Sequence, residues 1–377
     1  MQFLTSQKIR QFIFQATFLI VIFGVILAAY FVGQKNIVDQ GIATGFDFLT
    51  TTTGWPISFS LIDYSPRSTY TTALFIGLLN TLLVGLLTIF FATLLGLVLA
   101  LMRVSGNKMM MLVGTAYVEI FRNIPVILQV FFWYSILTHL PGVRDAYSIF
   151  DIIYLSNRGF MFPIPAFSAG DIGLLLLALG VAVIGYFLLR QSNLKAWRLP
   201  LFGSAFLMLA SFLLISGHPP ETPLFSIPEA RGLRFVGGLA LKPEFTALLI
   251  GLTLFGTSYI GEIIRGGLLS VDRGRLEAGA ALGLTPFQIN RLIRIPLAFR
   301  AMLPALANQF VWLMKATTVG IAIGFPDYFA IISTSINQSG QTLELLAFLM
   351  LGFIVINYSI SFLMNVLNAR LRLKGKS

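Results

Sequence analysis

Few ionisable side chains in this sequence could act on a ligand, and several of them lie within apolar stretches. Lys315 stands near the middle of one such stretch. A charge at the centre of a membrane helix costs about 2.5–3.5 kcal/mol, so such a residue requires a partner or a function. We expect Lys315 to line a translocation path, with Thr317 and Thr318 offering hydroxyl groups beside it. The alternative for Lys315 is a snorkelling side chain or an ion pair with a neighbouring helix.

Two acid–base pairs occur at a spacing of three residues in other apolar stretches. Glu119 and Arg122 form the first pair, and Glu262 and Arg265 form the second. Residues three apart lie on one face of a helix, so each pair predicts a local ion pair with a structural role. Gln129 follows the first pair after a proline, which favours a kinked helix that faces a pore. Arg122 and Gln129 are therefore also candidates for the translocation path.

Residues typical of enzymes and metal sites are nearly missing from the sequence. Cysteine is absent, and the only two histidines, His139 and His218, lie in loops without metal-ligand partners at useful spacing. The Gly-Lys-Ser at 375–377 imitates the end of a phosphate-binding loop, but the position of that motif's first glycine is Arg370, and we expect no helix after it. We expect no catalytic residue, no metal site and no cofactor bound to this chain.

A soluble-looking hairpin is predicted over residues 271–300, between two apolar stretches. Asp272 is suited to cap a first helix, and Gly283 can close that helix in the left-handed conformation. Thr285, Pro286 and Gln288 then form a capping box with proline at the first helical position.

The second helix of this hairpin has an apolar stripe and a polar stripe that contains Arg291. Pro296 is expected to end or kink it. The hairpin is interpreted either as a loop on the bilayer surface or as a docking element for a cytoplasmic partner. A DNA-binding helix-turn-helix is disfavoured because both helices are short and tethered to the membrane.

The composition places these residues in a polytopic membrane protein. Hydrophobic residues make up 56% of the chain and charged residues only 11%, with a mean hydropathy of +0.85. A helix needs about 20 apolar residues to cross a bilayer, and eight stretches satisfy this requirement. They predict an all-α fold with spans at about 12–32, 74–102, 112–138, 172–189, 199–216, 245–265, 301–324 and 343–366.

Charge placement predicts the orientation of these spans. The formal net charge is +11, and most Lys and Arg residues outside the spans fall on the side of both termini. By the positive-inside rule, both termini and the hairpin are cytoplasmic. The basic charge therefore indicates cytoplasmic loops, and no nucleic-acid partner is expected. The Pro-rich loops 139–171 and 217–244 lie outside, either as ordered caps or as mobile connectors.

The hairpin and its surroundings resemble the permease subunits of polar-amino-acid ABC importers. The run Glu277-Ala278-Gly279-Ala280-Ala281-Leu282-Gly283, with Ile295-Pro296 further on, resembles the EAA loop of that family, except that Gly279 replaces an alanine. Similar likenesses are YIGEIIRGG at 259–267, VEIFRNIP at 118–125, and KATT at 315–318 followed by Ile323-Gly324. The enlarged chain is most similar to the permeases of general L-amino-acid importers.

The resemblance covers about 70–138 and 245–370 and implies a type I importer core of five helices. It divides the chain into an N-terminal helix and loop (1–69), two parts of the core (70–138 and 245–377) and an insertion with two further helices (139–244). In that family the EAA loop couples to the ATPase subunit. The residues to which this role is carried over are Glu277, Ala278, Gly279, Ala281, Gly283, Thr285, Pro286, Arg291 and Pro296.

The resemblance also implies a set of partners in a bacterial inner membrane. They are a second permease, either a copy of this chain or a homologue, a dimer of ATP-binding subunits that hold ATP and Mg²⁺, and a periplasmic amino-acid-binding protein. The implied substrate is an amino acid, and membrane lipid surrounds the spans.

The main alternative is a secondary transporter driven by an ion gradient. It would require carboxylates near the bilayer midplane, whereas Glu119, Glu262 and Glu344 lie toward helix ends. An integral membrane enzyme would need a cluster of catalytic polar residues, which the sequence does not show.

Overall fold

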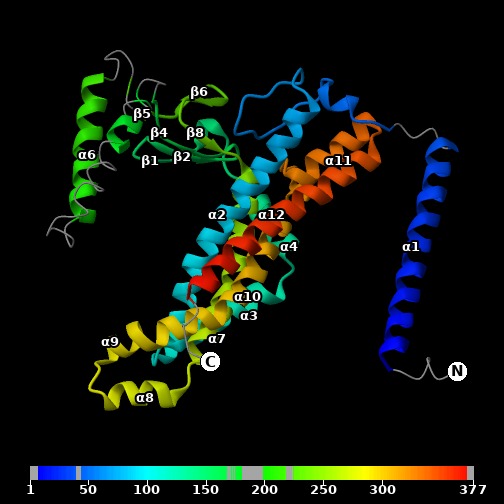
Figure 1. Ribbon diagram of the computed structural model, residues 1–377. Helices are drawn as coiled ribbons and strands as arrows, with labels where there is room; N and C mark the ends of the chain where they lie inside the picture. Colours follow the sequence, from blue (N-terminus) through cyan, green and yellow to red (C-terminus); the bar gives the residue numbers. More distant parts are fainter. Residues whose placement is uncertain are drawn as a thin grey trace. The chain divides into compact units, whose positions relative to one another are not determined.

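The computed structural model describes residues 7–39, 44–167, 171, 173, 175–180, 198–217, 223 and 225–371. These residues are mostly helical, which confirms the predicted helical membrane fold (Figure 1). The chain forms two compact units, one from residues 1–122 and 256–377 and the other from residues 123–255. Each unit is described by itself.

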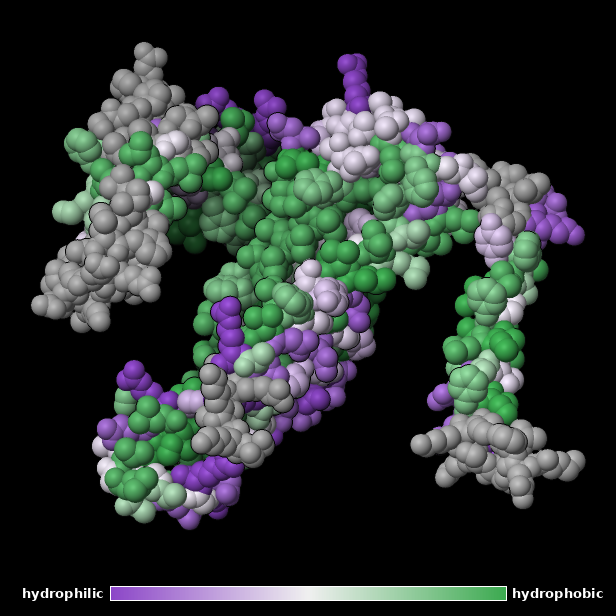
Figure 2. Space-filling view, in the orientation of Figure 1, coloured by the Kyte–Doolittle hydropathy of each residue, from purple (hydrophilic) through white to green (hydrophobic). Residues whose placement is uncertain are grey.

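Among the described residues, five helical segments are long and apolar enough to cross a membrane. Most of them present large apolar side chains on their surface, which appear green in Figure 2. Four of the segments lie in α1 (Gln7–Asp39), α2 (Tyr70–Val104), α7 (Pro243–Leu269) and α12 (Thr342–Leu371). The fifth is the continuous helical stretch Pro286–Ile323.

The span predicted over 112–138 is not one continuous helix. The structure has α3 (Lys108–Asn123) and α4 (Val126–Thr138), separated at Ile124 and Pro125. Pro125 cannot donate a backbone hydrogen bond, and its ring disfavours a helical conformation at the preceding residue. If this bent pair crosses the membrane as one span, the number of candidate spans rises to six.

The predicted number of eight spans rests partly on the insertion. Most of the expected span 172–189 lies outside the described residues. The expected span 199–216 corresponds to α6 (Arg198–Gly217), a helix of 20 residues whose side chains are described only in part. The count of eight therefore stays a prediction.

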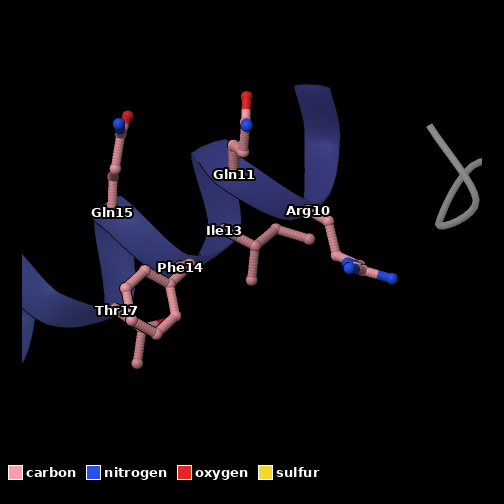
Figure 3. A pocket seen from close by; sticks show the side chains of 6 residues that line it. All are labelled: Arg10, Gln11, Ile13, Phe14, Gln15 and Thr17. Atoms are coloured by element: carbon pink, nitrogen blue, oxygen red, sulfur yellow. The ribbon is translucent and has the colours of Figure 1, made fainter. Parts of the chain in front are cut away.

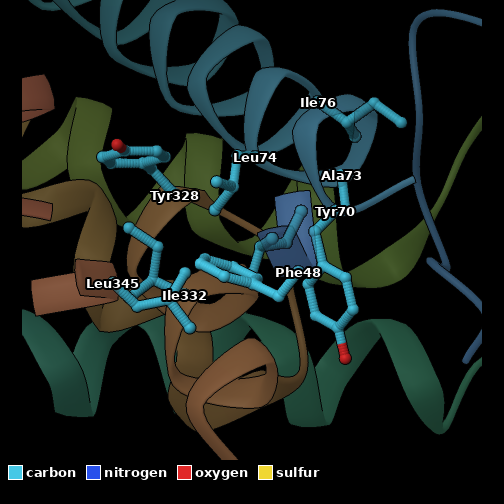
Figure 4. Close-up of a cluster of buried hydrophobic side chains, with 9 residues drawn as sticks. Phe48, Tyr70, Ala73, Leu74, Ile76, Tyr328, Ile332 and Leu345 are labelled. Atoms are coloured by element: carbon cyan, nitrogen blue, oxygen red, sulfur yellow. The ribbon is translucent and has the colours of Figure 1, made fainter. Parts of the chain in front are cut away.

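The first unit is held together by two apolar clusters. One joins the 3-10 helix η2 (Asp47–Thr50), the start of α2, α11 (Tyr328–Ser339) and the start of α12. Figure 4 shows Phe48, Leu74 and Ile332 of this cluster directed toward one another. The other cluster joins α2 to α7 and to α10 (Ile295–Ala316). Both clusters therefore fix α2 against the C-terminal half of the chain.

Close helix packing in the first unit depends on small residues. Gly96 of α2 faces Gly261 of α7, and a Cβ on Gly96 would lie 3.0 Å from the Gly261 nitrogen. A Cβ on Gly77 would lie 3.0 Å from the Cα of Tyr328 in α11. The backbones approach each other because these positions carry no side chain, as is usual for helix contacts in membranes.

The second unit contains short strands that the sequence did not predict. Where the Pro-rich loops were interpreted as caps or connectors, the structure has a four-stranded antiparallel sheet with the order β1-β2-β3-β8, and two paired ribbons, β4-β5 and β6-β7. The strands are β1 (Tyr147–Ile149), β2 (Ile153–Ser156), β3 (Gly159–Phe162), β4 (Ile164–Pro165), β5 (Phe225–Ser226), β6 (Glu229–Arg231), β7 (Arg234–Val236) and β8 (Leu239–Leu241).

The main sheet joins strands from both Pro-rich loops. Phe160, Met161 and Phe162 of β3 pair with Leu241, Ala240 and Leu239 of β8. The alternation of polar and apolar residues that marks a strand is short here, and no strand exceeds four residues. Strands of this length leave too little pattern in the sequence to be distinguished from loops.

Candidate functional site

The first arm of the hairpin is α8 (Arg273–Ala281), and its ends are closed as the sequence predicts. The Asp272 side chain accepts a hydrogen bond from the Gly274 nitrogen. At the other end, Gly283 has a φ of +76°. Its nitrogen donates to Ala280 and the Leu284 nitrogen donates to Gly279, which is the paired hydrogen-bond pattern of a Schellman motif. A glycine is required at position 283 because other residues are strained at this φ.

The second arm begins at α9 (Pro286–Ile289) with the predicted capping box. Thr285 Oγ1 accepts from the Gln288 nitrogen, and Gln288 Oε1 accepts from the Thr285 nitrogen. The expectation that Pro296 ends this helix is wrong, whereas the alternative of a kink at Pro296 stays a prediction. The chain continues through a π-helical turn, η6 (Asn290–Arg294), into α10, with Pro296 in the first turn of α10. A wider π turn accommodates a proline, which lacks the donor for a regular helical bond.

The two arms pack on each other through Gly279. It is the only residue of α8 that is buried, and a Cβ at this position would lie 2.8 Å from Ile293 Cδ1 and 3.3 Å from Ile289 Cγ1. Arg294 ties the hairpin to the end of α7, because its Nε donates to the Leu268 carbonyl over 3.3 Å. The hairpin is therefore a packed element joined to two membrane helices rather than an extended loop.

The outer surface of the hairpin carries an acid and exposed apolar side chains. Glu277, Ala278 and Ala281 are exposed. Leu282 is 82% exposed and Phe287 is 70% exposed, and neither was among the residues predicted for this site. Figure 2 shows hydrophobic and hydrophilic residues side by side over α8 and α9. The sequence position of Leu282 and Phe287 could have identified them. Each is a large apolar residue beside the closing glycine or the capping proline, and neither belongs to the buried stripe of a helix.

The remaining residues predicted to couple are also at this surface. Thr285 and Arg291 are exposed, and Pro296 is half-buried. The structure therefore brings the predicted hairpin residues together on one element.

A three-residue ion network lies between the ends of α2 and α7. Arg265 Nη2 lies 2.5 Å from Glu262 Oε1, so the predicted pair is present. Arg103 of α2 forms a second ion pair with the other carboxylate oxygen of Glu262. The sequence did not predict this contact, because Arg103 and Glu262 are 159 positions apart. The network joins two helices close to the point where α7 leads into the hairpin.

Arg122 has a neighbour that the sequence did not predict. Its guanidinium carbon lies 4.8 Å from the centre of the Tyr259 ring, which is the geometry of a cation–π contact. Glu119 also has polar contacts in the structure. The predicted pairing of Glu119 with Arg122 stays a prediction.

The candidate path residues are placed in different parts of the chain. Lys315 is exposed in the last turn of α10, later in its helix than the sequence suggested. Thr318 donates to the Lys315 carbonyl, whereas buried Thr317 donates to the Met314 carbonyl. Gln129 belongs to the second unit, where it is buried and donates to the Ile124 carbonyl.

A buried polar group of α2 holds the segment that follows α10. The amide nitrogen of Asn80 donates to the carbonyls of Phe59 and Pro326, over 3.0 and 2.8 Å. Asp327 caps α11 by accepting from the Ala330 nitrogen over 2.9 Å. Because Asp327 is fully buried, desolvation raises the pKa of its carboxyl to about 7.

Among the described residues, neither a hollow on the surface nor the metal-ligating side chains form a ligand site. The described residues that line a hollow on α1 are Arg10, Gln11, Ile13, Phe14, Gln15 and Thr17, all from one helix, so no second described element encloses a ligand there (Figure 3). No group of three or more metal-ligating side chains occurs among the residues that the structure describes.

The fold and the hairpin together define a helical, multi-pass membrane protein with a packed, exposed element between two spans. The chain belongs to the family of binding-protein-dependent transport system inner membrane components, whose model matches residues 92–373. This membership confirms the resemblance to importer permeases that the EAA-like hairpin suggested.

Relatives of similar length support the same family. The chain is 36% identical to the putative amino-acid ABC transporter permease protein YhdX of Escherichia coli, and the match covers 97% of this chain and 95% of the relative. It is also 36% identical to the general L-amino acid transport system permease protein AapQ of Rhizobium johnstonii, over 97% and 93% of the two chains. A solved amino acid ABC transporter has 21% identity and a TM-score of 0.47, with 80% of this chain and 95% of that chain covered.

Proposed function

We propose that this chain is the transmembrane permease subunit of an ATP-driven amino-acid importer, in which it forms half of the translocation path. The observation that carries the proposal is the hairpin α8–α9: it is packed internally, joined to α7 and α10, and exposes Glu277 with Leu282 and Phe287. A surface that combines a carboxylate with large exposed apolar groups suits a protein partner better than water.

The hairpin is built to pass motion into the membrane. Its second arm continues without a break into α10, and Arg294 holds the same arm to the end of α7. When a dimer of ATP-binding subunits closes, it would draw the hairpins of the two permeases together and move α7 and α10. Alternating access of the path follows, and hydrolysis of ATP resets it.

The proposed cargo is an amino acid that a periplasmic binding protein delivers. The relatives' names describe amino-acid transport, and Lys315 near the end of α10 offers an exposed cation for a substrate carboxylate. ATP and Mg²⁺ are assigned to the partner ATPase, and no cofactor is assigned to this chain. Thr317, Thr318, Arg122 and Gln129 remain the further candidates for the path.

Co-purification tests the docking role of the hairpin. The tagged chain is expressed with its genomic neighbours, purified in mild detergent, and its bound proteins are identified by mass spectrometry. We expect an ATPase subunit and a second permease to co-elute, and Glu277→Lys to lose the ATPase subunit by charge reversal in the docking surface. Asp63→Lys is the matched control, because Asp63 is an exposed acid outside the hairpin.

Either of two results would contradict this proposal. Retention of the ATPase subunit and normal uptake in Glu277→Lys would remove the hairpin from coupling. A chain that elutes alone, even with its neighbours present, would favour the ion-driven secondary transporter.

We also propose that both termini and the hairpin face the cytoplasm of a bacterial cell. The absence of cysteine makes the test direct, because a single introduced cysteine is the only target for a maleimide. An impermeant maleimide should label Ser148→Cys of β1 in intact spheroplasts. It should label Arg275→Cys of α8 only after the membrane is opened. The reverse labelling pattern would show that the termini and the hairpin face the periplasm instead.

A further inference from the structure

A cavity in the second unit is lined by three basic side chains and has no part in the proposed coupling. It is an open cavity of about 370 Å³, lined by residues of the ribbon β6–β7 and of the sheet. None of the described residues that line it is acidic. The lining residues are Arg158, Met161, Leu233, Arg234, Phe235, Gly237, Ala240 and Lys242.

The floor of this basic cavity is set by strand register. Tyr154, Met161 and Ala240 are directly paired across β2, β3 and β8, so they share one face of the sheet. The Phe235 ring of β7 packs on Tyr154, with 5.1 Å between ring centres. The ribbon β6–β7 is thereby held against that face, and Arg234, the residue before Phe235, is among the residues that line the cavity.

The rim of the cavity depends on a tight approach of two backbone segments. Gly159 follows Arg158 with a φ of +106°, and a Cβ there would lie 2.0 Å from the Leu241 carbonyl oxygen. The absence of a side chain lets the turn that carries Arg158 lie against the backbone of Leu241 and Lys242. The cavity is therefore a site fixed by the fold rather than a chance grouping of surface cations.

The charge of the cavity is positive. Among the described residues, Arg158 and Arg234 take part in no ion pair, whereas nearby Arg231 is neutralised by Glu229 at 2.9 Å. Lys242 adds a third basic group at the rim. Arginine side chains bind phosphate through paired donors, so an oxyanion is the ligand chemistry that this arrangement favours.

The position of the cavity in the chain places it at the membrane surface. Lys242 directly precedes Pro243, the first residue of the apolar span in α7. A residue at the end of a span lies at the level of the lipid headgroups. The second unit exposes several large apolar side chains, as expected for an element that rests in the interface. They are Phe225, Ile227, Leu233 and Leu239, of which Leu233 lines the cavity.

We propose that the basic cavity binds the phosphate of an anionic phospholipid headgroup, with Arg158, Arg234 and Lys242 contacting the phosphate and Leu233 and Phe235 contacting the acyl chain. A free phosphate would satisfy the cations but not the apolar wall. The lipid would fix the sheet of the insertion to the membrane at the start of α7. This inference does not depend on the coupling role of the hairpin.

The test uses the purified full-length chain with its co-purifying subunits, delipidated in detergent and titrated with single phospholipids. Native mass spectrometry would measure binding of phosphatidylglycerol and phosphatidylcholine. We expect the unchanged chain to bind phosphatidylglycerol at least about tenfold more tightly. Arg158→Gln combined with Arg234→Gln should remove that preference, whereas Arg231→Gln, a control on the same ribbon, should keep it.

Further outcomes of this experiment would identify the source of the bound anion. Equal binding of both lipids, or an unchanged preference in the double variant, would overturn the proposal. Complete competition by millimolar inorganic phosphate would assign the cavity to a free anion instead. Loss of binding-protein-stimulated ATPase activity in the double variant, with lipid preference intact, would assign it to a protein partner. Both arginines are exposed, so the double variant should keep the thermal unfolding midpoint of the unchanged chain.

Discussion

At the scale of single residues, Gly283 shows how one backbone angle shapes the candidate docking surface. Its φ of +76° closes α8 and directs the chain toward Thr285. A Cβ at this position meets open space, so any effect of substitution comes from backbone strain. The left-handed conformation costs a residue with a side chain about 1–2 kcal/mol. A substitution of Gly283 should therefore displace the turn between the two arms of the hairpin.

We therefore expect Gly283→Ala to weaken retention of the ATPase subunit by roughly tenfold, and Gly283→Val by more. Gly274→Ala in the same helix is the matched control, because its Cβ would make only an ordinary contact with Asp272 at 3.4 Å. Binding of the purified ATPase subunit to the permease in detergent measures both. If Gly283→Val and the unchanged chain bind the ATPase subunit equally, the conformation of this turn is not needed for docking.

Asp327 supplies a pH-dependent contribution to stability. Burial raises the pKa of its carboxyl from 3.8 to about 7. Since the pKa is higher in the folded state, the stabilising contribution is complete below about pH 4. It is lost as the pH rises through about 7, with an upper limit of about 4 kcal/mol.

Thermal unfolding of the detergent-solubilised chain at pH 5 and pH 8 tests this dependence. We expect the unchanged chain to unfold at a lower temperature at pH 8. Asp327→Asn should remove the difference, because asparagine caps a helix equally well without a titrating proton. The same pH difference in both proteins would assign the effect to other groups.

At the scale of elements, the ion network of Arg103, Glu262 and Arg265 fastens α2 to α7. The stem of Arg103 also packs on α3, because a Cβ on Gly114 would lie 2.6 Å from Arg103 Cγ. Arg103→Met preserves this packing and removes the charge, which leaves one oxygen of the half-buried Glu262 without its partner from α2.

We expect Arg103→Met to lower stability by about 1–3 kcal/mol, which corresponds to several degrees in the unfolding midpoint. Lys108→Met, an exposed cation at the start of α3, should change it little. A midpoint in Arg103→Met equal to that of the control would show that the network does not hold the two helices.

Local signals made the hairpin predictable, and long-range contacts limited the rest. Asp272, Gly283 and Thr285 act through neighbours within a few positions, so their caps and turn could be inferred from the sequence. The partner of Glu262 in α2 is far away in the chain, and the sequence carries no pattern for it. The π turn before Pro296 was also missed, because proline alone does not specify whether a helix ends or widens.

At the scale of the whole molecule, Glu262 and Glu344 of the described spans bear on the choice between the two classes of transporter. Glu262 is held by two arginines, and Glu344 at the start of α12 accepts from the Gly45 nitrogen over 2.8 Å. Glu119 also has polar contacts. An ion-coupled carrier needs a carboxylate that gains and loses a proton or sodium ion during each cycle. The contacts of Glu262 and Glu344 instead suit fixed structural roles.

We therefore expect amino-acid uptake to depend on ATP and not on the proton gradient. In proteoliposomes that contain the full complex, the binding protein and enclosed ATP, collapse of the gradient by a protonophore should leave uptake nearly unchanged. Replacement of ATP by a non-hydrolysable analogue should abolish it. Loss of uptake on collapse of the gradient, with ATP held constant, would favour the secondary transporter. The control is Glu262→Gln, which keeps the side-chain shape: reduced uptake that is still insensitive to the protonophore would show that Glu262 supports the fold and carries no coupling ion.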